Sequence, residues 1–104
     1  MAQFDVYANP NPDTCGDIPY LLDLQSDLLD PLTTRVVIPL IRHSSMPKPA
    51  RHLNPVFEVC GERVVLSTAE LAGVPRSALG EVVGSLSAHR DGIIRAIDFL
   101  IAGI

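Results

Sequence analysis

The sequence predicts a mainly β domain, a small and strongly bent antiparallel sheet or open barrel, that ends in one α-helix. Short apolar runs separated by proline and glycine fill the chain up to Leu86, and this is typical of short strands joined by turns. From Ser87 to Ile104 the apolar spacing becomes helical. The 104 residues, 47% of them hydrophobic, suffice for a single domain over 1–104.

The first predicted strand is 3–7, in which apolar and polar residues alternate and place Phe4 and Val6 inward. A loop with two prolines and a glycine follows over 10–16. Strand character returns over 20–26, with Leu22 and Leu24 on one face and polar residues on the other.

Leu28 and Leu29 stand between two carboxylates, Asp27 and Asp30, and just before Pro31. Charged neighbours and a proline are typical of the surface and not of a core segment. We therefore expect an exposed apolar corner at these two leucines.

The run 35–41 is rich in β-branched residues, but it contains Pro39, which cannot donate to a ladder and so indicates an edge strand or a bulge. The proline-containing stretch 44–54 is the longest predicted loop and has room for a short extra strand.

Strands over 56–60 and 63–67 flank Gly61-Glu62, a pair suited to a type II′ hairpin turn. A short strand within 69–74 would stop at Pro75, and 77–83 fits either a strand or a helical turn. About five strands result.

The predicted helix begins at Ser87, a good N-cap residue. One face of the helix carries an apolar stripe that is expected to pack on the sheet. The residues of this stripe are Leu86, Ile93, Ile97, Leu100 and Ile104. Gly103 followed by Ile104 predicts a left-handed, Schellman-type stop. Ile94, Phe99 and Ile101 lie beside or off the stripe, which fits either a second contact surface or a wide face on the sheet.

Charge is unevenly distributed along this chain of net charge −4. Six aspartates precede the first base, Arg35, and only bases follow as far as Arg51. This layout suits a charged protein partner, whereas a nucleic-acid footprint needs a more basic domain. The alternative is a set of ordinary solvated loops.

Metal and membrane sites receive no support from the sequence. Cys15 and Cys60 form no zinc motif and are expected to be reduced, the first in a loop and the second as a small strand hydrophobe. No apolar run has the length of a membrane helix, and the N-terminus has no basic segment followed by an apolar one, so a cytoplasmic protein is expected.

Catalysis has weak support. The usual nucleophile, phosphate-loop and metalloprotease motifs do not occur, and the carboxylate pairs among Asp23, Asp27 and Asp30 have no predicted pocket that would raise a pKa. An endoribonuclease on a small barrel would use arginine with histidine, and the candidates are Arg42, His43, Arg51 and His52. We expect no catalytic residues, metal or cofactor.

Several segments in order resemble the CcdB-type toxins of bacterial toxin–antitoxin modules. They are Gln3-Phe4-x-Val6-Tyr7, the eight residues from Asp23 to Asp30, Val37-Ile38-Pro39-Leu40, Val74-Pro75, and Ala96-Ile97 with the end Gly103-Ile104. The resemblance implies an SH3-like open barrel with a long C-terminal helix and a homodimer built around those helices. It also implies binding without catalysis: the toxin traps the DNA gyrase A subunit on cleaved DNA, and a cognate CcdA-like antitoxin reverses this.

Carried over by position, the resemblance gives two sets of residues. The gyrase-binding set is Leu28, Leu29, Arg95, Asp98, Ala102, Gly103 and Ile104, and the dimer-interface set is Ser26, Leu100, Ile101 and Ile104. The family pattern commonly ends in Trp-Gly-Ile, and Ala102 departs from it; Arg95 and Asp98 replace uncharged polar residues. The alternatives are a member that keeps antitoxin binding but has lost poisoning, and an endoribonuclease on the related barrel. An SH3-like peptide adaptor would need more aromatic residues.

Overall fold

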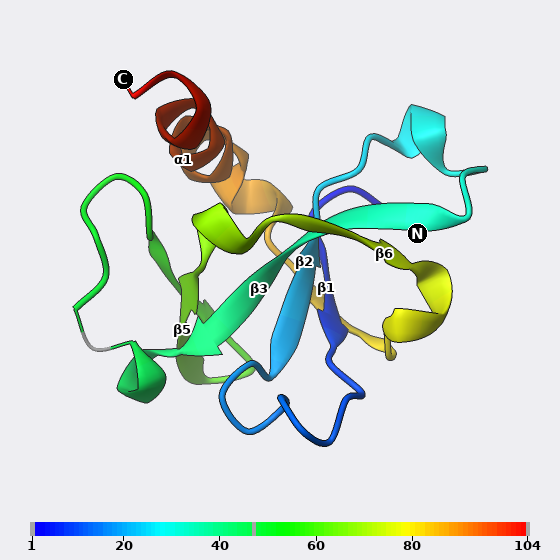
Figure 1. Cartoon of the computed structure of the whole chain (residues 1–104), viewed down its shortest axis with the longest axis horizontal. Coiled ribbons are helices and arrows are strands. Elements are labelled where there is room, and N and C mark those ends of the chain that lie inside the picture. Colours follow the sequence, from blue (N-terminus) through cyan, green and yellow to red (C-terminus); the bar gives the residue numbers. More distant parts are fainter. Residues whose placement is uncertain (1, 47, 104) are drawn as a thin grey trace.

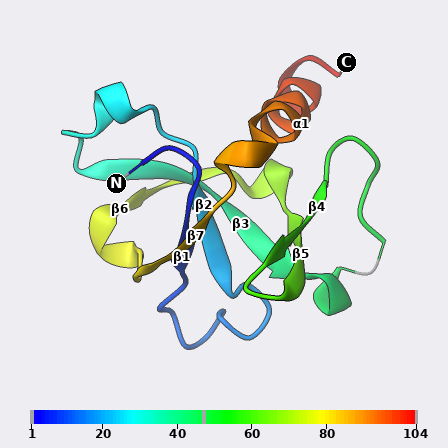
Figure 2. The same ribbon diagram turned by 180° about the vertical axis from the view of Figure 1, so that it is seen from behind.

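The computed structural model describes residues 2–46 and 48–103, and in this part of the chain the strands form one curled antiparallel sheet with a helix against it (Figures 1 and 2). The predicted bent sheet with a C-terminal helix is confirmed. The strands are β1 (Asp5–Ala8), β2 (Tyr20–Asp23), β3 (Thr34–Arg42), β4 (Val56–Val59), β5 (Glu62–Leu66), β6 (Ala72–Pro75) and β7 (Val82–Ser85). The helices are α1 (Arg90–Ala102) and the short 3₁₀ turns η1 (Asp27–Leu29), η2 (His43–Ser45), η3 (Thr68–Glu70), η4 (Arg76–Ala78) and η5 (Ser87–His89).

Strand β3 is central, so of the two alternatives that Pro39 suggested, an edge strand or a bulge, the edge strand was wrong. Along one side β3 pairs with β2, and along the other it pairs first with β6 and then with β5. The β6 pairing ends at Val37 and the β5 pairing begins at Leu40. Pro39 lies in the gap between these two pairings, where no neighbouring strand in the described part of the chain accepts a backbone N–H. Proline can therefore occupy this position without the loss of a ladder hydrogen bond.

The β4–β5 hairpin is confirmed, but its turn lies one residue earlier than predicted. Val59 pairs with Glu62, so the turn residues are Cys60 and Gly61, both with positive φ (51° and 77°). Two left-handed residues make a type I′ turn, not the predicted type II′. Cys60 is therefore an exposed turn residue, and its assignment as a strand hydrophobe was wrong; Cys15 does lie in a loop, and both thiols are free.

Strands β1 and β2 are shorter than the predicted strands 3–7 and 20–26, and the described residues contain seven strands instead of about five. In the ambiguous stretch 77–83, residues 77–78 end η4, residues 82–83 begin β7, and 79–81 connect the two. Within the described part of 44–54 there is no extra strand.

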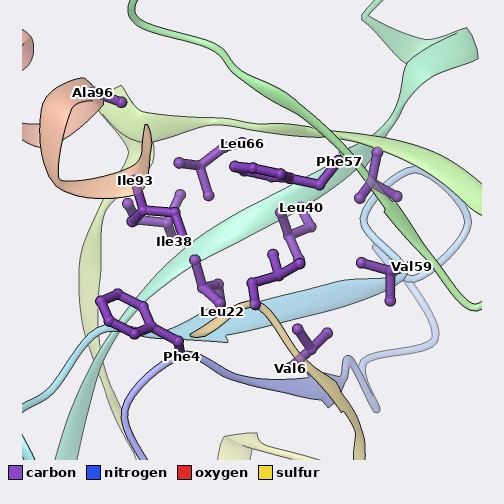
Figure 3. Close-up of a cluster of buried hydrophobic side chains, with 12 residues drawn as sticks. Phe4, Val6, Leu22, Ile38, Leu40, Phe57, Val59, Leu66, Ile93 and Ala96 are labelled. Carbon is purple, nitrogen blue, oxygen red and sulfur yellow. The ribbon is translucent and has the colours of Figure 1, made fainter. Parts of the chain in front are cut away.

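The core fills the inner face of the curled sheet and is closed by the first turns of α1 (Figure 3). Val6, Leu22 and Ile38 come from neighbouring strands and are completely buried, as is Ile93 from α1. Phe4, just before β1, also points into this core, as predicted. Its backbone has a positive φ of 69°. Burial of side chains of this size stabilises the fold by about 1.5–3 kcal/mol each.

The helix differs from the prediction at its start and agrees with it at its end. Ser87 opens the 3₁₀ turn η5 and makes no capping bond; its hydroxyl instead lies 3.2 Å from the Ser85 hydroxyl. At the other end Gly103 has φ of 74°, and its N–H donates to the carbonyl of Phe99 at 2.9 Å. The left-handed stop is confirmed, whereas the predicted role of Ile104 lies outside the described residues.

Candidate functional site

Two apolar features protrude from the fold at places where the sequence suggested contact residues. The first is the turn η1, called the leucine turn below, in which Leu28 is 90% exposed and Leu29 is 49% exposed. Its N-cap, the predicted interface residue Ser26, is half-buried and accepts a hydrogen bond from the Leu28 N–H. The predicted apolar corner is confirmed.

The second feature is the helix tip, which comprises Leu100–Gly103, the described end of α1. Ile101 is 80% exposed and Leu100 is 39% exposed. Ala102 and Gly103 are exposed as well. Leu100 and Ile101 are neighbours, and grouped exposed apolar side chains, unlike single ones, indicate a surface that another molecule covers.

A charged, shallow depression runs along the outer side of α1 towards this tip. It is lined by Arg90, Asp91, Ile94, Arg95 and Asp98. The predicted contact residues Arg95 and Asp98 are thus brought together, both exposed, with Ile94 half-buried beside them. Two bases and two acids around an apolar floor would fit a partner that also carries both signs of charge.

Within one chain the leucine turn and the helix tip lie at opposite sides of the molecule's upper edge (Figures 1 and 2). The predicted gyrase-binding residues therefore form two groups in the described structure and not one patch. Ile104, which belongs to both predicted sets, lies outside the described residues.

Gln3, Phe4 and Arg90 connect the leucine turn to the start of α1, and the residue-by-residue prediction missed them. The Gln3 N–H donates to Asp27 Oδ1 in the leucine turn at 2.7 Å. Arg90 reaches the Gln3 side-chain oxygen at 3.4 Å and lies 5.7 Å from the centre of the Phe4 ring, a cation–π contact. The available signal was the Gln3-Phe4 pair that opens the family-like pattern.

The arginines and histidines considered for ribonuclease chemistry do not converge. Arg42 forms an ion pair with Glu62 and donates to the carbonyl of Gly16 at 2.7 Å. His52, at the far end of the following loop, instead packs its ring against Phe99 of α1. His43 lies beside Arg42 in η2, and Arg51 is an exposed loop residue.

Neither a metal cluster nor a membrane span is found in 2–46 and 48–103. No group of three or more histidine, cysteine, aspartate or glutamate side chains in these ranges is arranged to hold a metal ion. No helix there is both long enough and apolar enough to cross a bilayer.

The comparison with protein families agrees with the geometry. The family model described as CcdB protein matches residues 3–103, nearly the whole chain, so the match covers both the leucine turn and the described helix tip. A match of this extent includes the curled sheet and the terminal helix in their order. This chain therefore belongs to the CcdB family, a family of toxins from bacterial toxin–antitoxin modules.

Proposed function

We propose that this protein acts in the cytoplasm as a homodimer that binds the A subunit of DNA gyrase, traps the enzyme on cleaved DNA, and is neutralised by a cognate CcdA-like antitoxin. The observation that carries the proposal is the family match over residues 3–103, joined to two exposed apolar features at the family-like segments. The action proposed is binding alone, without a catalytic residue, metal or cofactor.

A homodimer would cover the exposed apolar residues of the helix tip. A two-fold axis beside α1 would place two helix tips next to each other and cover Leu100 and Ile101, which are exposed in the single chain. Isologous contact also doubles each surface, so a symmetric target such as a gyrase A dimer would meet two copies of Ala102 and Gly103. Ser26 and Ile104 complete the proposed interface.

The proposed gyrase surface consists of residues that are open to a partner. Leu28 and Leu29 would supply apolar anchors, and the depression with Arg95 and Asp98 would supply charge complementarity. Apolar anchors determine most of the affinity of such a contact, while charges determine its specificity and its rate of formation.

Ala102 favours a second candidate function. An alanine presents little surface at the position where the family pattern commonly has tryptophan, and tryptophan is a frequent hot-spot residue. The second candidate is therefore a member that keeps the dimer and the antitoxin complex but binds gyrase too weakly to poison it.

Inducible expression in a gyrase-sensitive strain and in a strain with resistant gyrase A distinguishes the two candidates. Growth arrest in the sensitive strain alone supports poisoning, and purified protein should then increase cleaved DNA in a gyrase reaction. Normal growth of both strains, with tight binding to a CcdA-like peptide, supports the second candidate. Growth arrest in both strains with RNA breakdown contradicts both candidates.

A further inference from the structure

The exposed Leu28 side chain stands on a turn that is tied to the interior by buried polar groups. Leu28 itself is 90% exposed, yet Gln25 and Arg35, which hold the two residues that follow it, are 6% and 0% exposed. An ordinary surface loop has few such ties. The exposed Leu28 is therefore carried by a turn that buried side chains hold in place.

Gln25 forms the first tie. Its side-chain oxygen accepts the Val36 N–H of β3 at 3.1 Å, and its side-chain N–H donates to the carbonyl of Leu29 at 2.9 Å. One buried amide therefore connects the end of the leucine turn to the central strand. Both ends of the amide are used, so a side chain of the same size without hydrogen-bonding groups would leave the Leu29 carbonyl without this donor.

Arg35 forms the second tie. Its Nε and Nη2 donate to Asp23 Oδ2 at 3.1 and 2.6 Å, and its Nη1 donates to Asp30 Oδ1 at 3.1 Å. Asp30 directly follows the leucine turn. Asp23 Oδ1 also accepts the Gln25 N–H at 2.9 Å, so the two ties form one network.

A network of this kind is a poor way to gain stability alone. Burying a carboxylate and a guanidinium costs several kcal/mol of desolvation, which their attraction offsets only with good geometry, and apolar residues of similar volume often stabilise as well or better. What a buried and fully bonded network does provide is a single conformation for the backbone attached to it. In this fold that backbone carries Leu28.

We propose that Gln25 and Arg35 are positioning residues that hold Leu28 in one conformation before its partner arrives, so that the partner meets a preformed apolar protrusion. The inference deepens the proposed function, since it takes gyrase A as that partner. Leu28 makes the contact, and Gln25 and Arg35 act through it.

The effect of this preorganisation can be measured as a change in the apparent Kd for gyrase A. If a loosened turn holds Leu28 in the binding conformation for about one tenth of the time, the apparent Kd rises about tenfold. Gln25→Met removes the first tie and keeps the volume of the side chain. Asp30→Asn weakens the second tie at its partly exposed end and leaves the buried Asp23–Arg35 pair intact. Glu62→Gln, at the ion pair with Arg42 in another part of the sheet, is the matched control.

The experiment measures two quantities on the full-length protein: NMR relaxation of the Leu28 methyl groups in the free protein, and affinity for purified gyrase A. Both Gln25→Met and Asp30→Asn should increase the Leu28 motion and raise the Kd about tenfold, whereas Glu62→Gln should change neither. Leu28→Ala should raise the Kd too, and Gln25→Met should then add little in the Leu28→Ala background.

Two results would overturn the inference: unchanged Leu28 motion in both variants, or a Gln25→Met effect on affinity that is as large without the Leu28 side chain as with it. A purely structural role for Gln25 predicts the second result. If the wild-type protein does not bind gyrase A, the proposed function fails, and the relaxation data still decide whether Gln25 and Arg35 position Leu28.

Discussion

The imidazole ring of His52 packs against the ring of Phe99 in the last turn of α1, with centroids 5.8 Å apart and planes inclined at 48°. His52 has φ of 69°, a left-handed conformation that is uncommon without glycine. The neighbouring Asn54 anchors the loop: its side chain accepts the Ala50 N–H and donates to the Leu66 carbonyl, each at 3.0 Å. The loop thus supports the end of the helix that carries the proposed contact tip.

We predict that His52→Gly is less destabilising than His52→Ala. Both variants lose the ring contact, but glycine adopts positive φ freely while alanine does not, a difference of about 1 kcal/mol. Urea unfolding measures the two free energies. Both variants should also speed amide exchange at Gly103, whose N–H is bonded in the same helical turn. Cys60→Gly, at a left-handed residue in the β4–β5 turn, is the control and should leave Gly103 exchange unchanged.

Arg35→Ala should destabilise the fold far more than Arg42→Ala. Removing Arg35 leaves the completely buried Asp23 carboxylate without its partner, which costs about 3–5 kcal/mol. The Arg42–Glu62 pair is partly exposed on both sides, so its loss should cost about 1 kcal/mol or less. Thermal and urea unfolding compare the variants. Equal losses of unfolding free energy for the two arginines would contradict a structural role for the buried network.

Tyr7 should reduce stability at high pH. Its hydroxyl is buried and has no hydrogen-bond partner among the described residues, and desolvation, followed by Asp5 and Asp23, raises its pKa above the ordinary 10.0. A raised pKa means that the folded state favours the neutral phenol. The stability that Tyr7 contributes is therefore complete below its unfolded pKa and is lost as the pH rises through the higher folded pKa.

Tyr7→Phe tests this pH dependence. At neutral pH the variant should lie within about 1 kcal/mol of the wild type, because the lost hydroxyl has no described protein partner. At a pH above the ordinary tyrosine value of 10.0 it should lose less stability than the wild type. Some loss should remain, because burial and the Cys60 side chain also raise the pKa of Tyr20. Identical pH profiles of unfolding free energy for the two proteins would contradict the assignment.

Ile101→Ser should weaken the proposed dimer without unfolding the chain. The side chain is 80% exposed in the single chain, so its removal costs the fold little, but a dimer would lose one apolar contact on each subunit. We expect the dimer dissociation constant to rise roughly tenfold or more. Analytical ultracentrifugation measures it. Val82→Ser, at an exposed valine on β7, is the matched control and should leave the dissociation constant unchanged.

Ala102→Trp should strengthen binding to gyrase A. The position is exposed, so the larger side chain has room, and the family-like tryptophan would add a hot-spot residue worth about 2 kcal/mol, which lowers the Kd roughly thirtyfold. Calorimetry with purified gyrase A provides the measurement. An unchanged affinity would place the gyrase contact elsewhere on the protein.

The inner face of the sheet and the end of the helix were predictable because their signals are local. Alternation assigns Val6 and Leu22 to the core face whatever their partners are, and Gly103 stops a helix by its own backbone freedom. The same reasoning found Leu28, since a leucine between carboxylates is seldom buried. The predicted position of the hairpin turn was wrong by one residue, because apolar spacing does not reveal that Cys60 adopts a positive φ.

By itself, the sequence determined that short strands precede one helix, that side chains such as Val6 and Leu22 face the core, and that Leu28 and Leu29 meet solvent. Only the tertiary structure decided that Asp23 and Arg35, on the face of the sheet opposite Leu22 and Ile38, are completely buried together, and that Pro39 lies where β3 changes partner. The physical reason is that alternation assigns a residue to a face, whereas its burial depends on which distant segments come to lie against that face.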